Sequence, residues 1–80
     1  MKTLHLQYFA ILREQRGLTN ESMQTNASTP AQLYEELKCK HQFSLESEHL
    51  RAAVNGEFTS MDTSLSDEDE VVYIPPVAGG

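Results

Sequence analysis

Apolar and polar side chains alternate over the first nine residues of the chain. On one parity, the apolar members are Leu4, Leu6 and Tyr8. This period of two predicts a half-buried β-strand over residues 2–9, and the parity turns Phe9 away from the core.

A short helix and a second strand are expected next. Residues 10–16 are mostly good helix formers, and Gly17 suits the left-handed position that ends a helix. Residues 18–25 are mostly polar. A strand is expected there because it would pair antiparallel with the first strand.

The clearest local signal predicts the main helix. Thr29–Gln32 supplies an N-cap, a proline at the first helical position and the glutamine of a capping box. Leu33, Tyr34 and Leu37 then form an apolar stripe, which should run to about residue 41. On the solvent side, the spacing of residues 36 and 40, Glu36 and Lys40, predicts an ion pair.

The second half of the chain contains a predicted hairpin. Residues 43–49 are expected to form a loop whose apolar members close the edge of the core. Leu50–Val54 alternates, and Asn55-Gly56 then predicts a type I′ turn, which needs positive φ at both positions. Phe58 lies on the return strand, and an acidic corner follows at Asp67–Glu70.

The chain closes on a buried strand and a tail. Val71–Ile74 is β-branched or aromatic, whereas Pro75-Pro76 cannot donate to a sheet and favours an extended backbone. We therefore expect one domain over residues 1–80 whose residues 75–80 project as a tail. Gly79-Gly80 carries no side chain, so it fits a narrow channel and brings a carboxylate to a reagent.

Composition narrows the classes of partner. The net charge is −6, with 12 acidic and 6 basic side chains, which argues against nucleic acid and anionic membranes and favours a basic protein partner. Neither a membrane span nor a signal peptide is recognisable, so we expect a cytoplasmic protein. The lone Cys39 is expected to be an ordinary helix residue, and no metal site is predicted.

The tail resembles the C-terminal signature of the small subunits of molybdopterin synthase, which are ubiquitin-like sulfur carriers. Tyr8–Glu14 and Ala53–Glu57 resemble other recurring segments of that family. The resemblance implies an α+β fold of the β-grasp type, with a mixed sheet of about five strands, one main helix, one short helix and paired terminal strands. The family usually has Gly where Glu68 stands, so a different turn is expected there.

The resemblance also implies a chemistry for the tail. An activating enzyme would adenylate Gly80 with ATP and Mg²⁺, and a persulfide-bearing sulfur donor would replace AMP and leave a thiocarboxylate. The carrier would bind no cofactor and supply no catalytic group besides Gly80. It would insert into the large subunit, within a heterotetramer of two small and two large subunits, and give sulfur to cyclic pyranopterin monophosphate to build the dithiolene of molybdopterin. The inserted residues would be Pro75, Pro76, Val77, Ala78 and Gly79.

Three apolar residues are candidates for the docking face. In the family, the positions that match Phe9, Phe58 and Ile74 contact the large subunit and the activating enzyme. We expect them to form an exposed apolar patch on the sheet face that the helix leaves uncovered.

Three other functions stay open at this point. The same fold could carry sulfur for thiazole or another thio-compound, although Pro75-Pro76-Val77 favours the molybdopterin branch. A ubiquitin-like modifier needs the same adenylation and ends in an isopeptide bond. A plain protein-binding module with an inert tail would be unaffected by deletion of Gly79 and Gly80.

Overall fold

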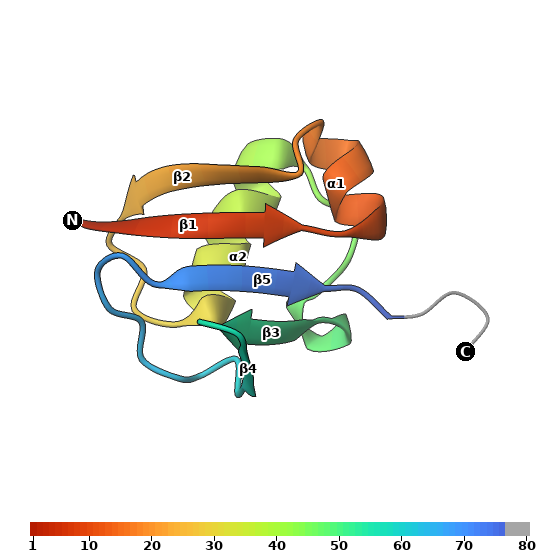
Figure 1. The fold of residues 1–80 in the computed structure, drawn as a ribbon. Helices are drawn as coiled ribbons and strands as arrows, with labels where there is room; N and C mark the ends of the chain where they lie inside the picture. Colours follow the sequence, from red (N-terminus) through yellow and green to blue (C-terminus); the bar gives the residue numbers. More distant parts are fainter. Residues whose placement is uncertain (77–80) are drawn as a thin grey trace.

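One mixed five-stranded sheet, packed against a long helix, builds the fold of the residues that the structure describes (Figure 1). The computed structural model describes residues 1–76. In chain order the elements are β1 (Lys2–Tyr8), α1 (Ala10–Arg16), β2 (Asn20–Thr25), α2 (Pro30–His41), a 3₁₀ turn (Ser47–His49), β3 (Arg51–Val54), β4 (Glu57–Thr59) and β5 (Glu70–Ile74).

The two terminal strands lie together at the centre of the sheet. The strand order is β2-β1-β5-β3-β4, with β1 and β5 parallel and the other neighbours antiparallel. Helix α2 crosses one face, and α1 lies at the end toward which β1 and β5 run (Figure 1). The predicted β-grasp architecture is therefore confirmed.

Most predicted elements are present, with small differences at their ends. Strand β1 stops at Tyr8 because Phe9 is the N-cap of α1 and Ala10 turns the chain with φ 51°. Gly17 caps α1 with φ 81°, as expected. Strand β5 begins one residue earlier than predicted, and the loop before β3 contains a 3₁₀ turn.

Two side-chain interactions predicted for α2 are wrong. The Thr29 hydroxyl accepts from the backbone N–H of Gln32, as a cap should. The Gln32 side chain, however, accepts from the backbone N–H of Ser28, whereas a capping box would use that of Thr29. Glu36 accepts a hydrogen bond from Thr25 at 2.6 Å in place of the ion pair with Lys40. A hydrogen bond from the buried Thr25 hydroxyl stabilises the Glu36 carboxylate more than an ion pair with exposed Lys40 would, because exposed ion pairs contribute little to stability.

The core between α2 and the sheet is rich in aromatic rings. Its fully buried tyrosines are Tyr8, Tyr34 and Tyr73. The rings of Tyr34 and Tyr73 lie 5.3 Å apart, and Phe43 packs against both Tyr8 and Tyr34. The loop around Phe43 thus closes the core edge, as predicted. Within residues 1–76, no helix has the length and apolar character needed to cross a membrane.

Candidate functional site

The start of the tail is held firmly by the core. Strand β5 is hydrogen-bonded on both sides, to β1 and to β3. The hydroxyl of buried Tyr73 donates to the carbonyl of Pro30 at 2.6 Å, and burial raises the pKa of Tyr73, so the donor keeps its proton at neutral pH. The chain therefore leaves Ile74 in a defined direction.

An open apolar groove of about 580 Å³ lies at this exit. Its walls are residues from the start of α1, the loop before β3 and the end of β5. They are Phe9, Ala10, Ile11, Leu45, Ile74, Pro75 and Pro76. An apolar hollow of this size at the base of a tail is suited to receive an apolar element of a partner.

Polar contacts brace the outer wall of the groove. The side chain of Gln15 in α1 donates to the Ser44 hydroxyl and accepts from the Ser44 backbone. The Tyr34 hydroxyl donates to the carbonyl of Leu45 at 2.8 Å. Burial raises the pKa of Tyr34 to about 12, so this hydroxyl is a donor at neutral pH. The groove is thus fixed by α1 and α2.

The three predicted docking residues do not all lie in the groove. Phe9, 39% exposed, and half-buried Ile74 both line the groove. Phe58, 69% exposed, lies outside it on edge strand β4. Phe58 stands opposite Ala53, and Ala53 stands opposite Val72 of β5, so all three share the face away from α2. Their role in binding stays a prediction.

Sequence reasoning did not find the outer wall of the groove. Ile11 is an exposed neighbour of the buried Leu12 in a helix too short to show an apolar stripe, and Leu45 belongs to a loop assigned only to the core edge. They face the tail through contacts between segments far apart in the chain, which a periodicity cannot predict. The predicted tail residues Val77, Ala78, Gly79 and Gly80 lie outside the described residues.

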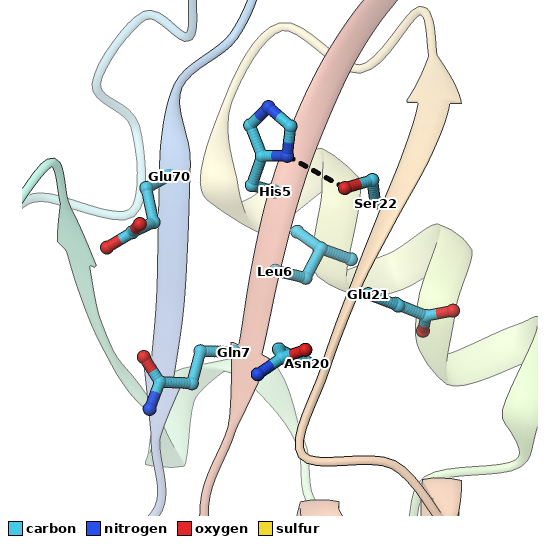
Figure 2. A pocket seen from close by; sticks show the side chains of 7 residues that line it. All are labelled: His5, Leu6, Gln7, Asn20, Glu21, Ser22 and Glu70. Carbon is cyan, nitrogen blue, oxygen red and sulfur yellow. Dashed lines mark hydrogen bonds between the residues drawn. The ribbon is translucent and has the colours of Figure 1, made fainter.

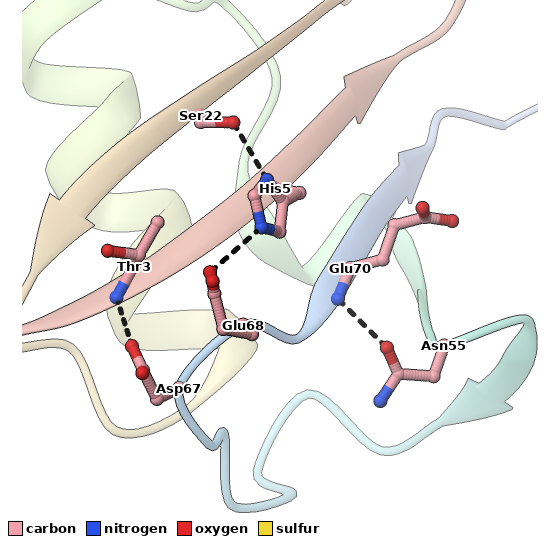
Figure 3. Close-up of polar contacts among 7 residues, drawn as sticks. All are labelled: Thr3, His5, Ser22, Asn55, Asp67, Glu68 and Glu70. Carbon is pink, nitrogen blue, oxygen red and sulfur yellow. Dashed lines mark hydrogen bonds and ion pairs between the residues drawn. The ribbon is translucent and has the colours of Figure 1, made fainter.

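A second, polar depression of about 290 Å³ lies on the sheet between β1, the start of β2 and the start of β5 (Figure 2). It is lined by His5, Leu6, Gln7, Asn20, Glu21, Ser22 and Glu70. Nδ1 of His5 shares a hydrogen bond with the Ser22 hydroxyl at 2.7 Å. Nε2 of His5 lies 3.2 Å from Glu68 (Figure 3). These contacts join β1 to β2 and to the acidic corner.

Hydrogen bonds fasten the acidic corner to β1, to the β3–β4 turn and to itself. Asp67 accepts from the backbone N–H of Thr3 (Figure 3). Asp69 accepts from the backbone N–H of Ser66 and from the side-chain amide of Asn55. Glu68 has φ 71°, the left-handed conformation that glycine adopts easily. The backbone at Glu68 thus keeps a glycine-like conformation, and the expected difference from the family's turn stays a prediction.

Cys39 is exposed on α2. Among residues 1–76, no three His, Cys, Asp or Glu side chains are grouped so that they could hold a metal ion.

The parallel terminal strands, the sheet order and the helix across one face define a ubiquitin-like β-grasp protein. The sequence model of the ThiS family matches residues 6–80, and the chain belongs to that family. It is 34% identical over 76 residues to the molybdopterin synthase sulfur carrier subunit of Escherichia coli strain K12, covering 91% of this chain and 94% of that protein.

Solved structures show the same fold. A Pyrococcus furiosus protein assigned as molybdopterin converting factor subunit 1 matches with TM-score 0.78 and 29% identity over 96% of this chain and 100% of its own. SAMP1 from Haloferax volcanii matches with TM-score 0.77 and 22% identity over 98% and 99% of the two chains. A chain in the complex of subunits 1 and 2 of the molybdopterin-converting factor from Helicobacter pylori matches with TM-score 0.66 and 23% identity. The match covers 98% of this chain and 99% of that chain. The last two likenesses support the fold alone.

Proposed function

We propose that this chain is the sulfur carrier subunit of a molybdopterin synthase. The observation that carries the proposal is a central strand leading into Pro75-Pro76 beside an apolar groove, in a chain 34% identical to such a subunit. The tail that follows has the residues to thread a narrow channel, because Gly79-Gly80 carries no side chains.

The reaction proceeds through the carboxyl group of Gly80. A carboxylate is a poor electrophile, so an activating enzyme first adenylates it with ATP and Mg²⁺ and releases pyrophosphate. The terminal sulfur of a persulfide-bearing donor then attacks the acyl carbon and displaces AMP, which gives an acyl disulfide. A second thiol, acting as the reductant, cleaves its S–S bond, so that the donor leaves as a disulfide with that thiol and Gly80 keeps the sulfur as a thiocarboxylate. The thiocarboxylate is the nucleophile that gives sulfur to cyclic pyranopterin monophosphate, and positioning and charge stabilisation come from the partner's pocket.

The groove and Phe58 form the surface on which the large subunit docks. The Helicobacter pylori structure is described as a complex of subunits 1 and 2 of a molybdopterin-converting factor. For this chain, a partner that seats an apolar side chain between Ile11 and Ile74 would grip the tail at its base. The assembly would contain two small and two large subunits.

Reconstitution tests the proposal. The chain carrying a thiocarboxylate is incubated with the large subunit and cyclic pyranopterin monophosphate, and the dithiolene product is measured. We expect product from the thiocarboxylate form and none from the carboxylate form or from a chain lacking Gly80. Transfer of sulfur to a thiazole precursor alone, or covalent attachment of the chain to lysines in a lysate, would replace this function by one of the alternatives.

A further inference from the structure

Asn55 lies where the β3–β4 turn meets the acidic corner. Its side-chain amide donates to Asp69 at 2.9 Å. Its side-chain oxygen accepts from the backbone N–H of Glu70 at 2.9 Å (Figure 3). Its own backbone N–H donates to the Glu70 carbonyl at 2.8 Å. Three hydrogen bonds therefore join this residue to Asp69 and to Glu70, the first residue of β5.

The residue after Asn55 makes the same position chemically vulnerable. Gly56 has no side chain to shield its backbone nitrogen, its φ is 87°, and an added Cβ would meet nothing within 4 Å. Both residues are exposed. The Gly56 nitrogen can attack Cγ of Asn55, so that a C–N bond forms, the Cγ–Nδ2 bond breaks and ammonia leaves. Water then opens the resulting succinimide to aspartate or isoaspartate.

We propose that Asn55 is a site of spontaneous deamidation in this protein, and that its hydrogen bonds to Asp69 and Glu70 control the rate. Attack requires Cγ to rotate toward the Gly56 nitrogen, and this rotation breaks both side-chain bonds. The reaction therefore proceeds from a locally opened turn, whose population those bonds keep low.

The product harms the fold where it forms. Replacement of the Asn55 amide by a carboxylate removes the donor to Asp69 and places two negative groups at hydrogen-bonding distance. Nearby, Asp67, Glu68 and Glu70 add to the repulsion. An isoaspartate also lengthens the backbone inside a two-residue turn, and the β3–β4 hairpin then loses its register with β5.

Peptide mapping by mass spectrometry tests the proposal, because deamidation adds about 1 Da to the fragment. The intact chain and a peptide of residues 50–60 are incubated side by side at mildly alkaline pH. We expect Asn55 to react about tenfold more slowly in the folded chain than in the peptide. Within the folded chain, Asn55 should still react faster than Asn20 or Asn26, because those two precede residues larger than glycine.

Asp69→Ala should raise the rate at Asn55 in the folded chain by about three- to tenfold. Asp67→Ala is the matched control. It removes one negative charge from the same corner, but the hydrogen bond it breaks is the one from Thr3 and not the one from Asn55. Circular dichroism confirms that both variants are folded. Equal rates in peptide and folded chain, equal rates in the two variants, or earlier reaction at Asn20 or Asn26 would overturn the proposal.

Discussion

Glu68 adopts a backbone conformation that is unfavourable for its residue type. Its φ of 71° places a side chain in the left-handed region, which disfavours residues with a Cβ, and its backbone N–H donates to the Thr3 carbonyl at 2.6 Å. The contact with His5 offers little in return, because both side chains are about half exposed.

Glu68→Gly should therefore stabilise the protein. The relief of the left-handed conformation exceeds the added freedom of glycine in the unfolded chain, and we expect the free energy of unfolding to rise by about 0.5 kcal/mol. Urea unfolding measures it. Glu70→Gly is the control, since Glu70 lies in β5, where glycine should destabilise. A loss of stability in Glu68→Gly would show that the His5 contact outweighs the backbone strain.

At the scale of elements, an ion pair fastens α1 to β2. Arg16 donates twice to the carboxylate of Glu21, each time at 2.8 Å, and the Tyr8 hydroxyl donates to the same carboxylate at 2.7 Å. The hydrogen bonds from Arg16 hold the pKa of Glu21 below its usual range. The same carboxylate therefore links a helix, an edge strand and the central strand β1.

Replacing this carboxylate should loosen α1. We expect Glu21→Gln to lower the free energy of unfolding by about 1 to 2 kcal/mol. The substitution removes the negative charge of the acceptor to which both Arg16 and the Tyr8 hydroxyl donate. Thermal unfolding measures it, with Glu14→Gln on the exposed side of α1 as the control. Equal effects of the two substitutions would contradict a role for this junction.

The contribution of this junction to folding stability should be lost at acid pH. Because the pKa of Glu21 is lowered in the folded state, its contribution is complete above the ordinary glutamate pKa and is lost as the pH falls through the folded value. The difference in stability between wild type and Glu21→Gln should therefore shrink as the pH is lowered below about 4.5. A difference that stays constant down to the acid transition would contradict this linkage.

The buried tyrosines of the core should make the folded protein less stable at alkaline pH. Burial raises the pKa of Tyr34 to about 12, and burial also raises the pKa of Tyr8 and Tyr73. Unfolded tyrosines lose their protons near pH 10, so the unfolded state gains stability first and the fold weakens as the pH rises above that value. Ultraviolet absorbance should show phenolate forming together with unfolding. Phenolate that forms fully in the native state would contradict the burial argument.

At the scale of the whole molecule, the sequence predicted nearly all of the elements and their order. Alternation, caps and the Asn55-Gly56 turn are local signals, and each gave its element within a residue or two. The pairing of β1 with β5 came from the resemblance to ubiquitin-like carriers. The groove could not be predicted, because Ile11 and Leu45 face Ile74 only after the sheet and α1 have packed.

The groove predicts which surface substitution disrupts docking. Ile11→Asp places a charge in the groove and should weaken binding to the large subunit at least tenfold, about 1.4 kcal/mol or more. Leu18→Asp is the control, since Leu18 is similarly exposed, 42% against 37%, but lies outside the groove. Titration calorimetry measures both. Phe58→Asp tests the neighbouring part of the face, and full binding by a folded Phe58→Asp variant would exclude it from the interface.

The most direct test of the central claim is the intact mass of the chain after incubation with ATP, Mg²⁺, its activating enzyme and a sulfur donor. Replacement of one oxygen of the Gly80 carboxylate by sulfur adds about 16 Da. We predict this gain, dependent on ATP and absent from a chain without Gly80. An unchanged mass with a competent activating enzyme, or a gain that persists without Gly80, would contradict the assignment of this tail as a sulfur carrier.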